Sequence, residues 1–153
     1  MEYTEEKYGD IIVVVVNLTR ATLNEAKGFM QVLHNCIAKK WTKIIVDLSD
    51  CEFIDSTYLG ALVISLKRVA EFKGDIRLVG FHPVVNSMFH LTRMDRVFET
   101  FKTKEEAIKS YKTRTFDLLQ SYFPGASEFK KQVSTKFKDL GIFGTPPHPP
   151  GKP

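Results

Sequence analysis

The chain has 153 residues, of which 43% are hydrophobic and 26% charged, and its formal net charge is +4 at pH 7. These values are typical of one globular domain with a short appendage. No stretch approaches the ~18 consecutive apolar residues of a membrane-spanning helix. Residues 1–7 are charged and lack the apolar core of a signal peptide, so we expect a cytoplasmic protein.

The positive charge lies mostly at the C-terminal end. Residues 113–153 carry six Lys or Arg and three Asp or Glu, so that residues 1–112 are nearly neutral and have no basic stripe. This distribution argues against nucleic-acid binding. Cys36 and Cys51 form no CxxC pair, and no cluster of histidine and acidic residues stands near them in the sequence. We therefore expect reduced thiols, no metal site and no cofactor.

The first elements predicted are a hairpin and a helix. Residues 2–8 predict a weak strand, and Gly9-Asp10 a tight turn. The β-branched run 11–16 predicts a second strand that is buried on both faces and pairs antiparallel with the first. After a loop over 17–22, a capping box of Thr22 and Glu25 opens a helix over 23–39. Its apolar positions at helical spacing are Leu23, Ala26, Met30, Leu33 and Ile37.

Strands and helices then alternate. Residues 43–48 predict the third strand, 57–72 a helix, and Gly74 the left-handed residue that ends this helix. The remaining elements are a strand over 76–80, a helix from Pro83 to Leu91, a strand over 98–101, and a helix from Thr103, its cap, to about Tyr111. This alternation predicts an α/β fold with a mixed central sheet of about five strands and about four helices.

The domain is expected to span residues 1–112. Residues 113–144 predict a partly helical C-terminal extension, and the proline-rich residues 145–153 predict a mobile tail. The extension has three possible roles: packing back on the domain, a homodimer contact, or docking to another protein.

The most informative segment is Asp55-Ser56-Thr57, which stands between an apolar stretch and a helical pattern. All three residue types cap helices well, because a side-chain oxygen can accept from free N–H groups of the first turn. A phosphate on Ser56 would meet the positive end of the helix dipole and add about −1.5 to −2 charges to a fixed surface.

These residues resemble the STAS domains of bacterial anti-sigma factor antagonists. The resemblance covers roughly residues 1–112. It is carried by Val46-Asp47-Leu48, Phe53-Ile54-Asp55-Ser56-Thr57, Leu59-Gly60-Ala61-Leu62, Gly74-Asp75-Ile76-Arg77-Leu78-Val79, Pro83-Val84-Val85, Leu91-Thr92, Asp95-Arg96-Val97-Phe98 and Lys104-Glu105-Glu106-Ala107.

The resemblance implies a non-enzymatic regulator of transcription that works by partner switching. In this family the serine after the aspartate is phosphorylated, which corresponds to Ser56, with Thr57 as the second choice. The implied partner is an anti-sigma factor that is also a histidine-kinase-like serine kinase, and a phosphatase is a further candidate partner. The expected partner-binding residues are Asp55, Ser56, Thr57, Tyr58, Ile64, Lys67 and Arg68, with Glu71 at the far end of the same helix face.

Two departures from the family pattern keep an alternative open. The family usually has Gly-x-Leu-Asp after the second strand, where this chain has Val16-Asn17-Leu18-Thr19, and it commonly has glycine at the position of Tyr58. We expect Tyr58 to protrude as an anchor or obstacle for a partner, or to lie on the helix surface. The alternative is a STAS-like interaction scaffold that has lost the phosphorylation switch. A relative of transporter-attached STAS domains and a ligand-sensing module are weaker alternatives.

An enzyme is the alternative of a different class. His34, His82, His90 and His148 stand in no recognisable catalytic motif, and the sequence has no Gly-x-Ser-x-Gly elbow. A phosphate-accepting Asp47 would need an acidic pair after an early strand, but that strand ends in Asn17-Leu18-Thr19. We therefore expect no catalytic residues.

Overall fold

The computed structural model describes residues 1–112, which form a five-stranded sheet with the order β1-β2-β4-β6-β7. The hairpin partners β1 and β2 are antiparallel, and the other neighbouring pairs are parallel. This confirms the predicted mixed sheet. The strands are β1 (Tyr3–Tyr8), β2 (Ile11–Val16), β4 (Lys43–Asp47), β6 (Asp75–Val79) and β7 (Thr100–Phe101).

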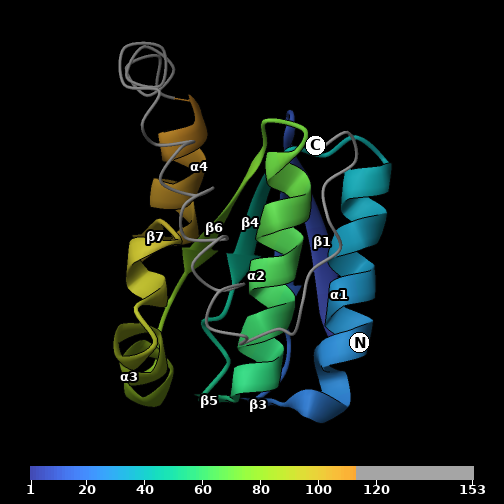
Figure 1. The fold of residues 1–153 in the computed structure, drawn as a ribbon. Helices are drawn as coiled ribbons and strands as arrows, with labels where there is room; N and C mark the ends of the chain where they lie inside the picture. Colours follow the sequence, from blue (N-terminus) through green and yellow to red (C-terminus); the bar gives the residue numbers. More distant parts are fainter. Residues whose placement is uncertain (113–153) are drawn as a thin grey trace, which may run out of the picture. The chain divides into compact units, whose positions relative to one another are not determined.

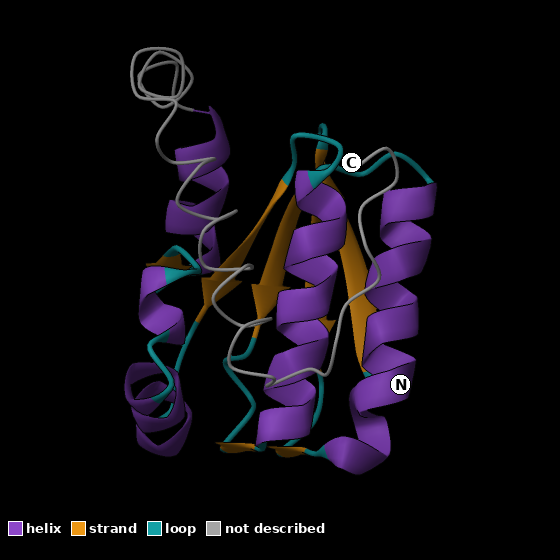
Figure 2. Ribbon diagram, viewed as in Figure 1, coloured by secondary structure: helices purple, strands orange, loops and turns teal. Residues whose placement is uncertain are grey.

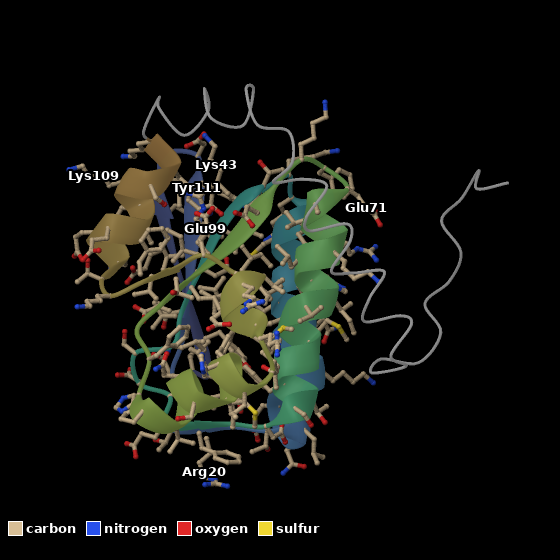
Figure 3. All side chains as sticks on the ribbon, turned by 60° about the vertical axis from the view of Figure 1, so that its left-hand side comes forward. Arg20, Lys43, Glu71, Glu99, Lys109 and Tyr111 are labelled. Atoms are coloured by element: carbon tan, nitrogen blue, oxygen red, sulfur yellow. The ribbon has the colours of Figure 1, made fainter. Side chains whose placement is uncertain are left out.

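Four α-helices accompany the sheet within these residues. The long helices α1 (Leu23–Ala38) and α2 (Ser56–Ala70) lie side by side on one face of the sheet, and α4 (Lys104–Lys112) covers the other (Figures 1 and 3). The shorter α3 (Pro83–Leu91) and a 3-10 helix (Met94–Arg96) connect β6 to β7. None of the helices in residues 1–112 is long and apolar enough to cross a bilayer.

Strand β2 is the centre of the core, as its unbroken β-branched run predicts. Ile11 and Val13 lie in a cluster with Ala107 and Tyr111 of α4, whereas Ile12 and Val14 alternate to the opposite face. All four side chains are 0–1% exposed. The strand is therefore buried on both faces, and the sheet is the middle of three layers.

Helix α4 is held by a buried polar cluster. The hydroxyl of Tyr111 lies 3.0 Å from the carbonyl oxygen of Ile44 and 2.8 Å from that of Asp75, and burial raises its pKa well above the usual value. The guanidinium of Arg77 lies 4.0 Å from the Tyr111 ring centroid and donates to the Ser110 hydroxyl at 2.6 Å. Helix α4 is therefore held to the sheet by these polar contacts in addition to its few apolar contacts.

A two-stranded parallel sheet closes one end of the domain. Strands β3 (Arg20–Ala21) and β5 (Phe53–Ile54) pair there, close to where α1 and α2 begin (Figure 2). The loop predicted over 17–22 therefore contains a strand. Two-residue strands carry no alternation, so their pairing depends on tertiary contacts that the sequence pattern does not reveal.

The end of α2 differs from the expectation. Lys73, not Gly74, takes the left-handed backbone conformation, with a φ of 61°. Gly74 is needed for another reason: a Cβ there would lie 2.5 Å from the Thr42 carbonyl oxygen and 2.6 Å from Val69 Cγ2. The glycine thus allows close packing of the α2–β6 loop. The predicted extension over 113–144 and the tail over 145–153 lie outside the described residues.

Candidate phosphorylation and partner-binding site

Asp55 organises the site, because its carboxylate caps one helix and holds the start of a second. Its extended backbone places it as the N-cap of α2, where Oδ1 accepts from the Tyr58 N–H at 2.9 Å. Its other oxygen, Oδ2, accepts from the Leu23 N–H, the first residue of α1, at 2.8 Å. The capping role expected for Asp55 is confirmed, and the link to α1 is new.

The start of α1 is fixed from its own side as well. The Thr22 hydroxyl accepts from the Asn24 N–H at 3.3 Å, and the Glu25 carboxylate accepts from the Thr22 N–H at 2.8 Å. This is the predicted capping box. Both helix starts are therefore held by side-chain hydrogen bonds, and they lie next to each other at the end of the domain that carries β3 and β5 (Figure 2).

Ser56 and Thr57 are the first two residues of α2, and both are solvent-exposed. Backbone N–H groups in the first turn of a helix have no partner within the helix, and the helix dipole makes this end positive. An anion bound to an exposed group here would be compatible with the backbone around it.

Tyr58 does not protrude, which corrects the expectation that it forms part of an exposed docking face. Its side chain is 0% exposed, and its ring stacks on Phe29 of α1 with centroids 4.5 Å apart and an interplanar angle of 11°. The third residue of α2 faces α1, so a large ring there fills the space between the helices. Tyr58 is thus a core residue and cannot anchor a partner directly.

The aromatic stack continues to the edge of the sheet. Phe29 also stacks on Tyr3 of β1 at 5.5 Å, and the hydroxyl oxygens of Tyr3 and Tyr58 are 2.9 Å apart, so that either can donate to the other. Burial raises the pKa of Tyr3 to about 12, and burial raises that of Tyr58 further. Both phenols stay protonated, and the stack connects β1, α1 and the first turn of α2.

The other residues expected on the docking face divide into two groups. Asp55, Ser56 and Thr57 lie at the end of the domain, whereas Ile64, Lys67 and Arg68 lie further along α2. Ile64 is 37% exposed, Arg68 is exposed and Lys67 is half-buried. Eight residues of helix, a rise of about 12 Å, separate Ser56 from Ile64. One partner must therefore span two helical turns to contact both groups.

Sequence reasoning missed two exposed residues at the end of the domain. Leu23, expected on the buried face of α1, is 63% exposed, because the first residue of the helix projects beyond the sheet. Arg20 of β3 is exposed, and its guanidinium carbon lies 4.3 Å from the Phe53 ring centroid. Leu23 and Arg20 lie near Ser56 because the start of α1 contacts Asp55, and the sequence pattern does not reveal this contact.

A second polar cluster near this end lacks the geometry of a catalytic triad. The Ser49 hydroxyl donates to Asp47 at 2.5 Å, but His82 Nε2 lies 2.7 Å from the Ser49 carbonyl oxygen and not from its hydroxyl. A serine nucleophile needs its base at the hydroxyl. These contacts instead tie the β4–β5 loop to the start of α3.

Comparison with known proteins agrees with this architecture. The family model described as STAS domain matches residues 5–107. A Thermotoga neapolitana protein, named as a candidate anti-sigma factor antagonist and TM1081 homolog, is 30% identical over 106 residues, covering 69% of this chain and 93% of that protein.

Solved structures share the fold. The crystal structure of TM1081 from Thermotoga maritima, titled a candidate anti-sigma factor antagonist, superimposes with a TM-score of 0.66 at 28% identity, covering 72% of this chain and 95% of that one. The phosphorylated form of SpoIIAA, a Bacillus cell fate determinant, gives a TM-score of 0.58 at 17% identity over 71% of this chain and 98% of that one. Through residues 5–107, this chain belongs to the STAS domain family, whose members similar to it are named as anti-sigma factor antagonists.

Proposed function

We propose that the protein is an anti-sigma factor antagonist that binds an anti-sigma factor with serine kinase activity and is switched by phosphorylation of Ser56. The observation that carries the proposal is the exposed Ser56 hydroxyl at the first position of α2, beside a helix start fixed by Asp55. The names of its relatives support the antagonist role. SpoIIAA, which shares the fold, exists in a phosphorylated form.

The proposed switch is a change of charge at a site whose backbone is held in place. Asp55 already uses both carboxylate oxygens to hold the starts of α1 and α2. A phosphate on Ser56 adds about −1.5 to −2 charges next to this carboxylate. A partner that covers this surface with apolar groups would then have to desolvate an unpaired charge, and one with acidic groups would be repelled. The core below remains intact.

The proposed interface lies at the end of the domain and continues along α2. Leu23, Ser56 and Thr57 form its exposed centre, and Ile64 and Arg68 extend it along the helix. Leu23 supplies the apolar contact that Tyr58, being buried, cannot supply. ATP and Mg²⁺ belong to the kinase in this scheme, and a phosphatase would restore the unmodified protein. We place these reactions in the cytoplasm.

The alternative is an interaction scaffold of the same fold without the switch. It is favoured by the loop after β2, where Val16-Asn17-Leu18-Thr19 stands in place of the family's usual Gly-x-Leu-Asp and lacks its acidic residue. Asn17 in this loop has a structural role instead. The Asn17 amide donates to the Thr4 hydroxyl at 2.8 Å and to the Met1 carbonyl at 3.2 Å. Because the Asn17 amide already forms these hydrogen bonds with the N-terminal segment, it is not available to contact a kinase.

The two proposals are separated by a phosphorylation assay. The protein is incubated with ATP and histidine-kinase-like anti-sigma factors from the same organism, and modified peptides are identified by mass spectrometry. The switch predicts one phosphate on Ser56 and none in a Ser56→Ala variant. A chain that binds such a partner but takes no phosphate on Ser56 or Thr57 would support the scaffold.

A further inference from the structure

Arg20 is an exposed cation whose position is determined by a neighbouring ring. In the parallel pair β3–β5, Arg20 lies opposite Phe53 and Ala21 lies opposite Ile54. Ala21 and Ile54 are fully buried, so the alternation of strand side chains turns Arg20 and Phe53 outward. The guanidinium carbon lies 4.3 Å from the Phe53 ring centroid, and Figure 3 shows Arg20 projecting from this end of the domain.

This arrangement brings a cation close to the proposed phosphorylation site. Phe53 precedes Ser56 by three residues, so their Cα atoms are separated by at most about 10 Å. The segments around Arg20 and Ser56 are also joined by a hydrogen bond from the N–H of Leu23 to Asp55. Leu23 follows Arg20 by three residues, and Asp55 directly precedes Ser56. Arg20 and Ser56 are both exposed, and the arginine side chain is long and flexible, so the guanidinium over Phe53 is within reach of a phosphoryl group on Ser56.

The contact that Arg20 makes is one that a phosphate can displace. Within residues 1–112 its guanidinium forms no ion pair with a carboxylate, and residues 17–19 before it are uncharged. A cation over a phenyl ring at an exposed site is held weakly. Arg–phosphate pairing is charge-assisted and frequently bidentate, and it is the stronger interaction.

We infer that Arg20 is an internal receptor for a phosphate on Ser56: on modification, its guanidinium leaves the Phe53 ring and pairs with the phosphoryl oxygens. This rests on the proposed function in taking Ser56 as the modified residue. The switch then alters the surface at two points. Part of the added charge is neutralised within the protein, and the Phe53 ring, covered in the unmodified protein, becomes exposed to solvent.

The inference is tested without a kinase by placing phosphoserine at position 56 during synthesis. The second pKa of the phosphate, ordinarily about 6, is measured by ³¹P NMR titration. Pairing with Arg20 predicts a lowered pKa in the parent chain and an increase of about 0.5 or more in Arg20→Ala, because a nearby cation favours the dianion. Arg20→Lys should retain part of the lowering, and Phe53→Leu, which removes the competing ring, should retain all of it or lower the pKa further.

Arg68→Ala is the matched control, since Arg68 is an exposed arginine of α2 about 18 Å along the helix from Ser56. It should leave the phosphate pKa unchanged. Circular dichroism of each variant establishes that it is folded, and if Arg20→Ala is not, Arg20→Gln replaces it. Equal phosphate pKa values in the parent and in the folded Arg20 variants would overturn the inference. Because the phosphate is introduced by synthesis, that result would not contradict phosphorylation of Ser56 by a kinase. Equally, a failed kinase assay would not contradict a measured pairing of Arg20 with the phosphate.

Discussion

The Asp55 carboxylate accepts a hydrogen bond from the backbone N–H of Leu23 at 2.8 Å, although 32 residues separate the two positions. The same carboxylate caps α2 through the Tyr58 N–H. One side chain therefore fixes the starts of both long helices, and the proposed modification site follows it directly in the sequence. The shape of this end of the domain depends on Asp55, and its charge depends on Ser56.

Replacing Asp55 should therefore destabilise the protein more than the loss of a single helix cap usually does. Asp55→Ala removes the acceptor for two backbone N–H groups and should lower the free energy of unfolding by about 2 kcal/mol. Asp55→Asn keeps one carbonyl acceptor and should lose roughly half as much. Urea denaturation followed by circular dichroism measures both. Equal stability of the alanine variant and the parent would contradict the role given to this carboxylate.

The architecture follows from the sequence because its strands and helices are long and strongly patterned. The β-branched run 11–16 and the capping box of Thr22 and Glu25 can each be recognised from residue type and spacing alone. The pairing of β3 with β5 could not be predicted this way, because each strand has two residues and is held by contacts between distant segments.

The candidate site could be predicted only in part, again because some of its contacts join residues that are distant in the sequence. Asp55 and Ser56 are recognisable as a helix start from residue type alone. Whether Tyr58 turns inward depends on Phe29 and Tyr3, which lie elsewhere in the sequence and complete the stack. The exposure of Leu23 likewise depends on where α1 begins relative to the sheet, which helical spacing does not reveal.

The burial of Tyr58 predicts the effects of two substitutions. Tyr58→Ala removes a ring packed on Phe29 and should lower the free energy of unfolding by about 3–5 kcal/mol. Tyr58→Phe keeps the stack, loses only the bond to the Tyr3 hydroxyl, and should lose about 1 kcal/mol. Thermal and urea unfolding measure these losses. If Tyr58→Phe weakened partner binding while leaving stability unchanged, the ring edge would belong to the interface after all.

His34 should make stability depend on pH. Burial lowers its pKa in the folded protein, and the charge of Arg68 lowers it further, so the unfolded chain binds a proton at a higher pH than the folded one. Stability is then fully present above the ordinary histidine pKa of about 6.5 and decreases as the pH falls below it. Urea denaturation at pH 7.5 and pH 5 should show this loss.

The matched variants for this prediction are His34→Gln and His90→Gln. His34→Gln removes the titrating group and should reduce the difference in stability between the two pH values. His90 is an exposed residue of α3, and its replacement should leave the contribution of His34 in place. An identical pH dependence in His34→Gln and the parent would assign the effect to other groups.

A chain that ends at Lys112 should fold on its own. The sheet, both long helices and the buried Tyr111 cluster are complete within residues 1–112. The shortened protein should give a cooperative urea transition with a free energy of unfolding within about 1 kcal/mol of the full chain, in the range of small domains. A much lower stability would show that residues 113–153 form part of the core.

The central claim is most directly tested by the affinity of the protein for its anti-sigma partner with and without a negative charge at position 56. Isothermal titration calorimetry compares the parent chain with Ser56→Asp and with Gln31→Glu, which places one equivalent charge on the exposed face of α1. The switch predicts that Ser56→Asp weakens binding roughly tenfold or more while Gln31→Glu changes it little, with unaltered circular dichroism in both. Equal affinities of the parent and Ser56→Asp would contradict it.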